Sequence, residues 1–414
     1  MEFNQAPSFT MHIDLNSCFA SIEQQANPFL RGKPVAVAAF ATDRGCILAA
    51  SVEAKKLGIK TGMRVFEGRR IYPKLVVLPP DPWKYRCVHL ELRRLISEYT
   101  SDFVPKSIDE FTLNLEGYPA AKTASLGVVA QEIKQRIKSE IGDWLTVSVG
   151  IAPNRYLAKI AAGLHKPDGL DEINKDNFLD VYSKLKLTDL TGIKTRNAVR
   201  LNSMGIYSVL SFYEAPIWQL RAAFHSINGL YWHMRLGGFE VDNIEFGRRS
   251  YGNSVAIGAN ISKTDDLSPI LARLTEKMCM RLRMSGYSAG GVHLGIVYKD
   301  GSWWHKGRQM SGPRFDSRDL YKAAFNLLSE ANPGKPVLNI AVSCFDLTKS
   351  KNLQLEFFND LPRKKKLVEA EDRINARWGG FTVGSARSFR GGGVVLDRIA
   401  FGGIKELEEF TLNS

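Results

Sequence analysis

Residues 11–23 read Met-His-Ile-Asp-Leu-Asn-Ser-Cys-Phe-Ala-Ser-Ile-Glu. Apolar side chains alternate at Met11, Ile13 and Leu15, which predicts a β-strand with one face in a core. Asp14 is out of phase with these residues, so its carboxylate lies on the opposite face of the strand. A carboxylate in this position is placed to bind a ligand, although an acidic residue at a solvated sheet edge would give the same pattern.

A second acidic pair, Asp109 and Glu110, follows Ser107 and Ile108. Neighbouring residues in a regular strand point to opposite faces, so both carboxylates can serve one site only where a strand begins, ends or turns. Together with Asp14 they offer the oxygen ligands that Mg²⁺ prefers. Two such ions about 3.5–4 Å apart can clamp the attacking and leaving oxygens of a phosphoryl transfer. The alternative is a solvated acidic turn that holds no metal.

Four stretches of the chain together resemble the Y-family, or translesion, DNA polymerases. They are residues 11–23, Ser-Ile-Asp-Glu-Phe at 107–111, Thr-Val-Ser-Val-Gly-Ile-Ala-Pro-Asn-Arg-Tyr-Leu-Ala-Lys-Ile-Ala-Ala at 146–162 and Lys-Pro-Asp-Gly at 166–169. The motifs follow the family's order and spacing, and the family layout extends from about residue 8 to about residue 350. The resemblance implies a template-directed DNA polymerase that adds deoxynucleotides to a primer 3′ end and tolerates damaged template bases with low fidelity.

The predicted fold class is α/β multidomain, because strands and helices alternate, a helical part follows residue 173, and a second α/β segment comes later. The resemblance implies a right-hand polymerase. Its parts would be a discontinuous palm with a mixed sheet (8–17 and 83–173), small fingers (18–82), a helical thumb (174–244), a linker (245–254), an α/β little finger (255–350) and a C-terminal tail (351–414). In the little finger we expect strands at 291–298 and 338–345 and helices at 266–284 and 318–330, and in the tail a short helix at 370–378.

The resemblance also implies the roles of individual residues. Asp14, Asp109 and Glu110 match the catalytic carboxylates that bind metal, and the carbonyl of Leu15 would be a further oxygen ligand. The expected cofactor is a pair of Mg²⁺ ions, for which Mn²⁺ could substitute. Lys166 matches the lysine that contacts the incoming triphosphate, with an ordinary surface-loop lysine as the alternative.

Three further residues face the nucleotide if the resemblance holds. Phe19 matches the aromatic residue that packs under the deoxyribose and excludes a 2′-hydroxyl, although a core phenylalanine of the first helix would look the same. Val52 and Lys55 stand where many members carry Tyr and Arg; Val donates no hydrogen bond, and Lys lacks the bidentate fork of Arg. We therefore expect weaker or rearranged triphosphate binding. With Asn16 in place of a common Asp, these substitutions favour the UmuC-like branch over the DNA polymerase IV branch without deciding between them.

The charge balance favours a polyanionic partner. Lys and Arg number 56 against 43 Asp and Glu, and the net charge is +13. Residues 190–206 resemble a helix-hairpin-helix, which offers backbone amides at a helix N-terminus to a phosphate. Lys194 replaces a usual glycine there, and a plain helical hairpin is the alternative. Further candidates for phosphate contact, each also explained by solvated surface charge, are Arg248, Arg249, Lys299, Lys306, Arg308 and Arg314.

A short segment near the C-terminus suggests a protein partner. Gln-Leu-Glu-Phe-Phe at 354–358 resembles the peptide by which bacterial polymerases dock on the sliding clamp, with Gln354, Leu355, Phe357 and Phe358 as anchors. The alternative is a last strand that buries two of these side chains. The other expected partners are primer-template DNA and deoxynucleoside triphosphates. We expect a monomer, and the sequence leaves accessory subunits open.

The expected location is the cytoplasm. No apolar run reaches the roughly 18 residues that suggest a membrane span, and the N-terminus lacks the pattern of a signal peptide. Two other classes of function remain as alternatives. A catalytically silent scaffold subunit of a mutagenesis complex would keep the fold and lose the metal ligands, which are intact here. A non-enzymatic helix-hairpin-helix DNA-binding protein would need none of the palm motifs.

Overall fold

The computed structural model describes residues 2–119, 125–243, 247–331, 334–349, 361–391 and 393–395. These residues form two compact units, one within residues 1–244 and the other within residues 245–397. Within the described ranges, no helix combines the length and the apolar character that a membrane crossing needs.

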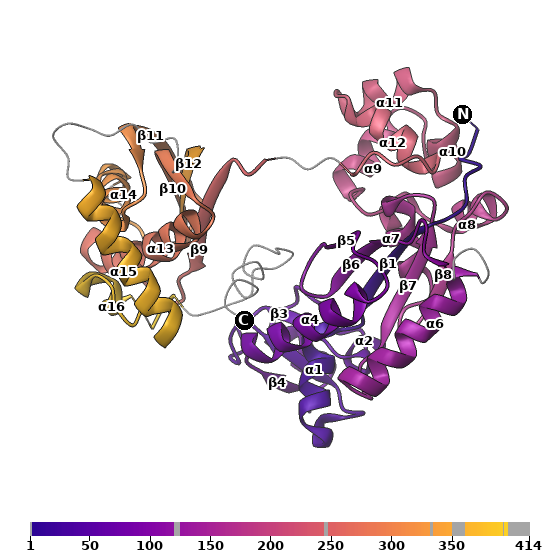
Figure 1. Ribbon diagram of the computed structural model, residues 1–414, viewed down its shortest axis with the longest axis horizontal. Helices are drawn as coiled ribbons and strands as arrows, with labels where there is room; N and C mark the ends of the chain where they lie inside the picture. The colour runs from indigo at the N-terminus through magenta and orange to yellow at the C-terminus, as the bar shows by residue number, and fades with distance from the viewer. Residues whose placement is uncertain are drawn as a thin grey trace. The chain divides into compact units, whose positions relative to one another are not determined.

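A five-stranded mixed sheet organises the first unit (Figure 1). In sheet order its strands are β5 (Phe103–Pro105), β6 (Glu110–Asn114), β1 (Thr10–Leu15), β7 (Val147–Ala152) and β8 (Leu170–Glu172). The central strand β1 is antiparallel to both of its neighbours, whereas β7 and β8 pair in parallel. Mixed strands combined with helices confirm the predicted α/β class.

One face of this sheet carries the apolar residues of β1 into a core, as the alternation in β1 predicts. Met11, Ile13 and Leu15 are buried in a core shared with three helices. The helices around the sheet are α1 (Cys18–Ala26), α4 (Pro82–Ser97), α6 (Leu126–Arg136) and α7 (Arg155–Leu164), of which α1, α4 and α6 contribute side chains to this core. On the opposite face α7 crosses β7 so closely that a Cβ on Gly150 would lie 2.1 Å from the carbonyl oxygen of Ala158. Only glycine permits this approach.

Two smaller assemblies complete the first unit. A three-stranded sheet, ordered β3 (Ile47–Ala50), β2 (Val35–Ala38) and β4 (Val76–Leu78), packs with α2 (Val52–Lys56) and α3 (Val65–Ile71) on a separate core. After it in the chain come the helices α8 (Phe178–Lys184), α9 (Thr195–Asn202), α10 (Val209–Glu214), α11 (Ile217–Phe224) and α12 (Asn228–Leu236). These helices share a core that includes Tyr182, Phe212 and Trp232. The division of this unit into palm, fingers and thumb stays a prediction.

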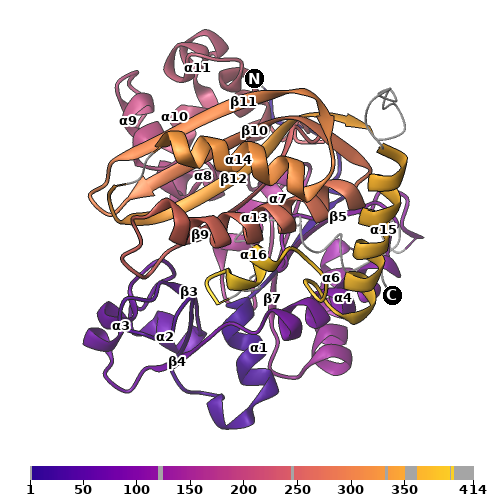
Figure 2. The same cartoon turned by 90° about the vertical axis from the view of Figure 1, so that its left-hand side faces the viewer.

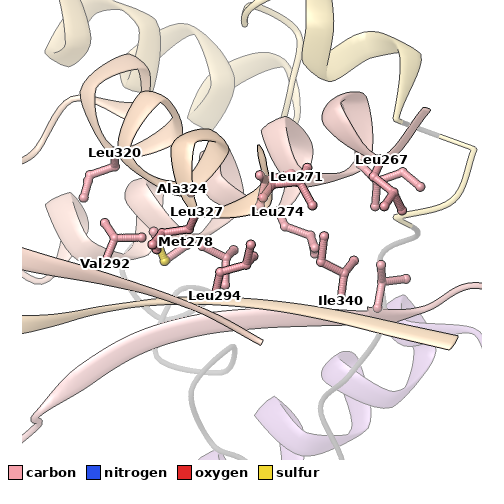
Figure 3. Packing of buried hydrophobic residues seen from close by; sticks show 14 of the residues in the cluster. Leu267, Leu271, Leu274, Met278, Val292, Leu294, Leu320, Ala324, Leu327 and Ile340 are labelled. Atoms are coloured by element: carbon pink, nitrogen blue, oxygen red, sulfur yellow. The ribbon is translucent and has the colours of Figure 1, made fainter. Parts of the chain in front are cut away.

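The second unit contains a four-stranded antiparallel sheet with helices on one face. The strand order is β11 (Trp303–Arg314), β10 (Tyr287–Tyr298), β12 (Val337–Lys349) and β9 (Ser250–Ala256). Figure 2 shows α13 (Thr264–Met284) and α14 (Ser317–Ala331) lying across this sheet. In Figure 3, Leu274 and Met278 of α13 point toward Val292 and Leu294 of β10, and Leu327 of α14 joins them. This packing forms the core of the unit.

Three elements of the second unit differ from the predictions. β9 begins at Ser250, inside the predicted linker 245–254, because Tyr251 is buried against the core despite its small polar neighbours. β11 was not predicted, since as an edge strand it is mostly exposed and carries charged and glycine residues with little apolar alternation. The predicted helix 370–378 is part of a longer helix that starts at Leu361, because the basic residues before it are good helix formers.

The described part of the C-terminal tail packs on the second unit. It comprises α15 (Leu361–Trp378) and α16 (Ala386–Arg390). Arg283 of α13 makes two hydrogen bonds of 2.7 and 2.6 Å to the carboxylate of Asp372 in α15. Arg273 of α13 lies over the ring of Phe381. A bidentate ion pair that is largely shielded from solvent, together with a cation–π contact, ties this segment to α13.

Candidate active site

Strand pairing brings the predicted carboxylates together. Asp14 and Glu110 are register partners across β1 and β6, and the backbone N–H of Leu15 donates to the carbonyl oxygen of Asp109 at 2.9 Å. β6 begins at Glu110, so Asp109 lies just before the strand. A strand start is one of the places where adjacent carboxylates can face one site. A ligand atom of each of His12, Asp14 and Glu110 lies within 4.8 Å of the other two.

A cavity of about 520 Å³ lies beside these carboxylates. Every predicted metal or nucleotide residue except Glu110 lines it, namely Asp14, Leu15, Phe19, Val52, Lys55, Asp109 and Lys166. Lys56 and Thr61 also line it, and sequence reasoning missed both. A lysine next to Lys55 and a threonine in a turn carry no pattern that separates them from ordinary surface residues, so only the fold reveals their position. We call this the nucleotide cavity.

Asp109 also lines a second cavity, of about 510 Å³, on the α7 side. Its lining includes Glu110 and His12 together with the basic residues Lys106, Arg155 and Lys159. A cationic wall beside acidic residues suits a phosphodiester strand whose end must reach the carboxylates. Arg155 and Lys159 are four residues apart on α7 and so share one helix face, which is the sequence signal that could have found them. We call this the basic cavity.

Two lysines pair with two of the three carboxylates. Lys166 Nζ lies 2.5 Å from Oδ2 of Asp14, and Lys159 Nζ lies 2.6 Å from Oε2 of Glu110. The Lys159 pair was not predicted. Ion pairing of this kind compensates for gathering like charges in a partly buried place.

The pKa values of the three carboxylates are shifted in different directions. Burial raises the pKa of Asp14 to about 6, against the opposing charge of Lys166. Burial also raises the pKa of Asp109. For Glu110, burial again acts upward, but the hydrogen bond and charge of Lys159 outweigh it, so the pKa lies below its usual value. Burial lowers the pKa of His12 to about 3, which keeps the ring neutral. Perturbed titratable groups that line cavities are typical of functional sites.

Phe19 both packs against a neighbour and lines the nucleotide cavity. Its ring stacks on Tyr85 of α4, with centroids 4.3 Å apart and planes 9° apart. The hydroxyl of Tyr85, which is buried, donates to Oε1 of Glu23 at 2.9 Å, and Lys84 pairs with the other oxygen of Glu23. The two interpretations of Phe19, core residue and cavity wall, are therefore compatible. This stacking holds the ring in a defined place.

Asn16 connects the first motif to the Lys-Pro-Asp-Gly loop. Its side-chain nitrogen donates to Oγ of Ser148 at 2.9 Å, and its side-chain oxygen accepts from the backbone N–H of Asp168 at 2.8 Å and from Oγ1 of Thr146. An amide can donate and accept at once, whereas an ionised Asp can only accept. The network fixes the loop that carries Lys166.

The helix-hairpin-helix candidate has a defined turn. Gly192 has φ of +93°, where glycine is favoured. Lys194 is the N-cap of α9 with φ of −116°, an ordinary extended value. The turn therefore needs no glycine at position 194, and the lysine is exposed beside the helix N-terminus.

The phosphate-contact candidates of the second unit have different surroundings. Lys306 and Arg308 of β11 pair with Leu294 and Val292, which face the helices, and both cations form ion pairs with Glu330 of α14. They therefore lie on the helix-covered side of the sheet. The other four candidates also differ from one another. Arg249 is exposed and Arg314 is half-buried. Arg248 lies over the ring of Tyr251, and Lys299 donates a hydrogen bond to Asn260. The clamp candidates Gln354, Leu355, Phe357 and Phe358 lie outside the described residues.

Known proteins similar to this chain agree with one another. The family model of the impB/mucB/samB family matches residues 13–163, and the model of the C-terminal domain of this family matches residues 248–357. DNA polymerase IV of Pelotomaculum thermopropionicum is 33% identical, over 93% of this chain and 96% of the relative. DNA polymerase IV of Moorella thermoacetica is 32% identical, over 92% and 96% respectively.

Solved structures agree on the fold. A chimera of the Y-family DNA polymerases Dbh and Dpo4 superposes with a TM-score of 0.72 at 24% identity, covering 82% of this chain and 99% of the chimera. An insertion ternary complex of Dbh DNA polymerase gives a TM-score of 0.58, also at 24% identity, with the same coverage of each chain.

The relatives bear on the branch as well as the family. Those named above are called DNA polymerase IV, so the preference for the UmuC-like branch suggested by Asn16, Val52 and Lys55 finds no support in them. The two family matches, and identity of 33% along nearly the whole of both chains, show that this chain belongs to the impB/mucB/samB family, the Y-family DNA polymerases.

Proposed function

We propose that this translesion DNA polymerase performs nucleotidyl transfer at Asp14, Asp109 and Glu110, with the incoming nucleotide in the nucleotide cavity and the primer end in the basic cavity. The observation that carries this proposal is the position of Asp109, which lines both cavities. A carboxylate between the two can act on the primer hydroxyl and on the triphosphate at the same time. The proposed substrates are primer-template DNA and deoxynucleoside triphosphates.

The donor set fits divalent cations that prefer oxygen. Asp14, Asp109, Glu110 and the carbonyl of Leu15 offer only oxygen atoms, the ligand type of Mg²⁺, and Mn²⁺ could substitute. Two such ions, when bound, activate the primer 3′-hydroxyl and neutralise charge on the triphosphate. Lys166 and Lys159 pair with carboxylate oxygens of Asp14 and Glu110, which would hold such ions.

The surrounding side chains supply orientation. Lys166, once released from Asp14, is available to contact the phosphates as a point charge, with Lys55 and Lys56 on the same cavity wall. Phe19 presents its ring to the cavity and leaves little room for a 2′-hydroxyl. Val52 contributes no hydrogen bond, so the phosphate contacts rest on lysines. Template choice by base pairing needs no side chain that reads sequence.

The deciding experiment is primer extension by the purified chain with Mg²⁺, with EDTA, and with the Asp109→Ala variant. We expect template-directed extension only in the first case. A scaffold subunit would bind DNA and extend nothing under any condition. A helix-hairpin-helix binding protein would give the same DNA affinity in all three conditions and no extension. Extension that persists in EDTA would contradict the metal-dependent mechanism.

The proposal also covers the oligomeric state, the cellular location and a protein partner. We propose that the chain works as a monomer in the cytoplasm, away from membranes, and docks on a sliding clamp through Gln354, Leu355, Phe357 and Phe358. The support for docking is the resemblance of residues 354–358 to a clamp-binding peptide. A polymerase of this kind gains processivity by tethering, since tethering raises the local concentration of the primer end.

A further inference from the structure

His12 is a buried histidine beside the carboxylates with no part in the mechanism proposed above. It is 1% exposed and lies on β1 two residues before Asp14, on the same face of the strand. Thr112 of β6 and Gly150 of β7 are its register partners. Because position 150 has no side chain, α7 closes over this face of the sheet. The imidazole lines the basic cavity together with Glu110.

The two ring nitrogens of His12 have different surroundings. Nδ1 lies 3.2 Å from Oγ1 of Thr112. Nε2 is buried and has no hydrogen-bond partner among the residues that the structure describes. Buried polar atoms in native proteins are nearly always satisfied, and one without a partner needs an explanation. At the edge of a cluster of carboxylates, the simplest explanation is a ligand that binds there.

The spacing around His12 suits a cation. A ring nitrogen of His12 and one oxygen each of Asp14 and Glu110 lie within 4.8 Å of one another. No hydrogen bond joins the imidazole to either carboxylate in the described structure. Donors that each sit about 2.0–2.2 Å from a common ion are separated by up to about 4.4 Å, so three groups at this spacing can close on one cation with small movements.

We propose that His12 is a nitrogen ligand of this site: Nε2 offers its lone pair to the divalent cation held by Asp14 and Glu110, while Nδ1–H donates to Thr112. The inference rests on the proposed function, because it takes these carboxylates to bind the catalytic cations. Histidines that bind metals usually donate the other ring N–H to an oxygen acceptor, which fixes the tautomer. Thr112 is placed to do this, and the neutral ring is the form that binds metal.

A nitrogen ligand changes which ions the site prefers. Mg²⁺ takes oxygen ligands and dehydrates reluctantly, whereas divalent transition-metal ions also accept imidazole. His12 would therefore raise the affinity for Mn²⁺ more than that for Mg²⁺. In this role it determines ion specificity, in a site that otherwise offers only oxygen.

The test uses Mn²⁺ as a probe on the full-length chain without DNA. Pulsed electron paramagnetic resonance detects the ¹⁴N of an imidazole bound directly to Mn²⁺, and titration of the free-ion signal gives the affinity. We expect ¹⁴N coupling in the wild type. His12→Phe, which keeps ring size, should lose it and bind Mn²⁺ about tenfold more weakly, whereas Mg²⁺ affinity by competition changes less than about twofold. Thr112→Val, which keeps the imidazole and removes its acceptor, should weaken Mn²⁺ binding by less than His12→Phe.

A second histidine serves as the matched control. His233 of α12 is also buried, at 7% exposed, and its Nδ1 also has no partner among the described residues. His233→Phe should leave the ¹⁴N coupling and the Mn²⁺ affinity unchanged. Absence of histidine ¹⁴N coupling in the wild type overturns the inference, whether or not any variant folds. So does a folded His12→Phe protein with unaltered Mn²⁺ affinity.

The two proposals fail separately. Mg²⁺-dependent primer extension by the wild type tests the function, and Mn²⁺ coordination in the DNA-free protein tests the role of His12. A chain that extends primers but shows no ¹⁴N coupling keeps its function and loses this inference. A chain that shows the coupling but extends nothing keeps the nitrogen ligand and loses the proposed reaction.

Discussion

Asp14 and Glu110 stand opposite each other on the antiparallel strands β1 and β6, and each is paired with a lysine from another element. The register of two strands from distant parts of the sequence thus decides whether the site exists. A slip of one residue would move every β6 side chain to the other face. The strong burial of Ile13 and Phe111, also register partners, holds that register.

The first prediction concerns the carboxylates. Asp109→Ala or Glu110→Ala should abolish primer extension but leave primer-template affinity within about twofold, because affinity comes from the basic surface and the metals serve the chemistry. Extension and fluorescence anisotropy measure the two quantities. Glu116→Ala, an exposed carboxylate just after β6, is the matched control and should extend normally. Full activity of Asp109→Ala would exclude the two-metal assignment.

The second prediction concerns stability and pH. The pKa of Asp14 is about 6 in the folded chain against an ordinary 3.8, so its protonated form favours folding. That contribution is complete below about pH 4 and is lost as the pH rises through 6, which costs the wild type about 3 kcal/mol at neutral pH.

Asn at position 14 cannot ionise and avoids this cost. Asp14→Asn should therefore unfold with a free energy higher by about 1–3 kcal/mol at pH 7.5 in EDTA, and the difference should vanish near pH 4. Urea denaturation at both pH values measures it. A variant less stable than the wild type at pH 7.5 would show that the pairing with Lys166 outweighs the burial of the carboxylate.

The third prediction concerns sugar selection. Phe19→Ala should raise ribonucleotide incorporation relative to deoxyribonucleotide incorporation by about 10- to 100-fold, since the ring no longer blocks the 2′-hydroxyl. The ratio of kcat/KM for the two nucleotides measures it. Phe29→Ala, which removes a ring that is 82% exposed, is the control. An unchanged ratio with a large fall in melting temperature would leave Phe19 as a core residue only.

The site residues that could be predicted are those that belong to short sequence patterns, such as an alternation of apolar residues or a motif. The alternation in β1 predicts that Asp14 lies on the strand face opposite the core. The four motifs, in the order of the Y-family polymerases, imply the roles of Asp109, Glu110 and Lys166. Lys106 could not be assigned, because a lysine in a turn has the same local pattern whether it faces solvent or lines a cavity. The spacing of Arg155 and Lys159 predicts that both lie on one face of α7, but it does not show that this face meets Glu110, so the pair of Lys159 with Glu110 depends on the fold. His12 was missed for a related reason. It lies on the Asp14 face, and its burial depends on how α7 packs over Gly150.

The same distinction applies to the fold: elements with a strong local pattern could be predicted, and elements that depend on tertiary packing could not. The buried strands and amphipathic helices of the second unit were predicted, because their periodicity is strong. β11 was not, because its exposed edge position needs no apolar alternation. Lys306 and Arg308 stay predicted phosphate contacts, but the sequence could not show on which face of the sheet they lie. Their ion pairs with Glu330 depend on α14 packing beside β11.

The fourth prediction concerns the triphosphate. Lys166→Ala should lower kcat/KM for the nucleotide about 10- to 100-fold, the range expected when a hydrogen bond to a charged group is lost. Val52→Tyr combined with Lys55→Arg should lower KM, since both changes add donors on the wall of the nucleotide cavity. Steady-state kinetics decide both. Lys60→Ala, an exposed lysine just after α2, is the control. If Lys166→Ala leaves both constants unchanged, the Lys-Pro-Asp-Gly loop does not contact the phosphates.

The last prediction concerns access to the primer. A clamp tether raises the local concentration of the polymerase at the primer end without any new contact in the active site. Replacing Gln354, Leu355 and Phe358 with Ala should therefore leave extension of a short linear primer unchanged and remove the stimulation by a loaded bacterial sliding clamp. The exposed Leu367→Ala in α15 is the control and should keep the stimulation. Stimulation that persists in the triple variant would exclude this docking peptide. Loss of clamp-free extension in the same variant would instead assign the segment to the folded core, because only a packed strand would disturb the catalytic parts when truncated.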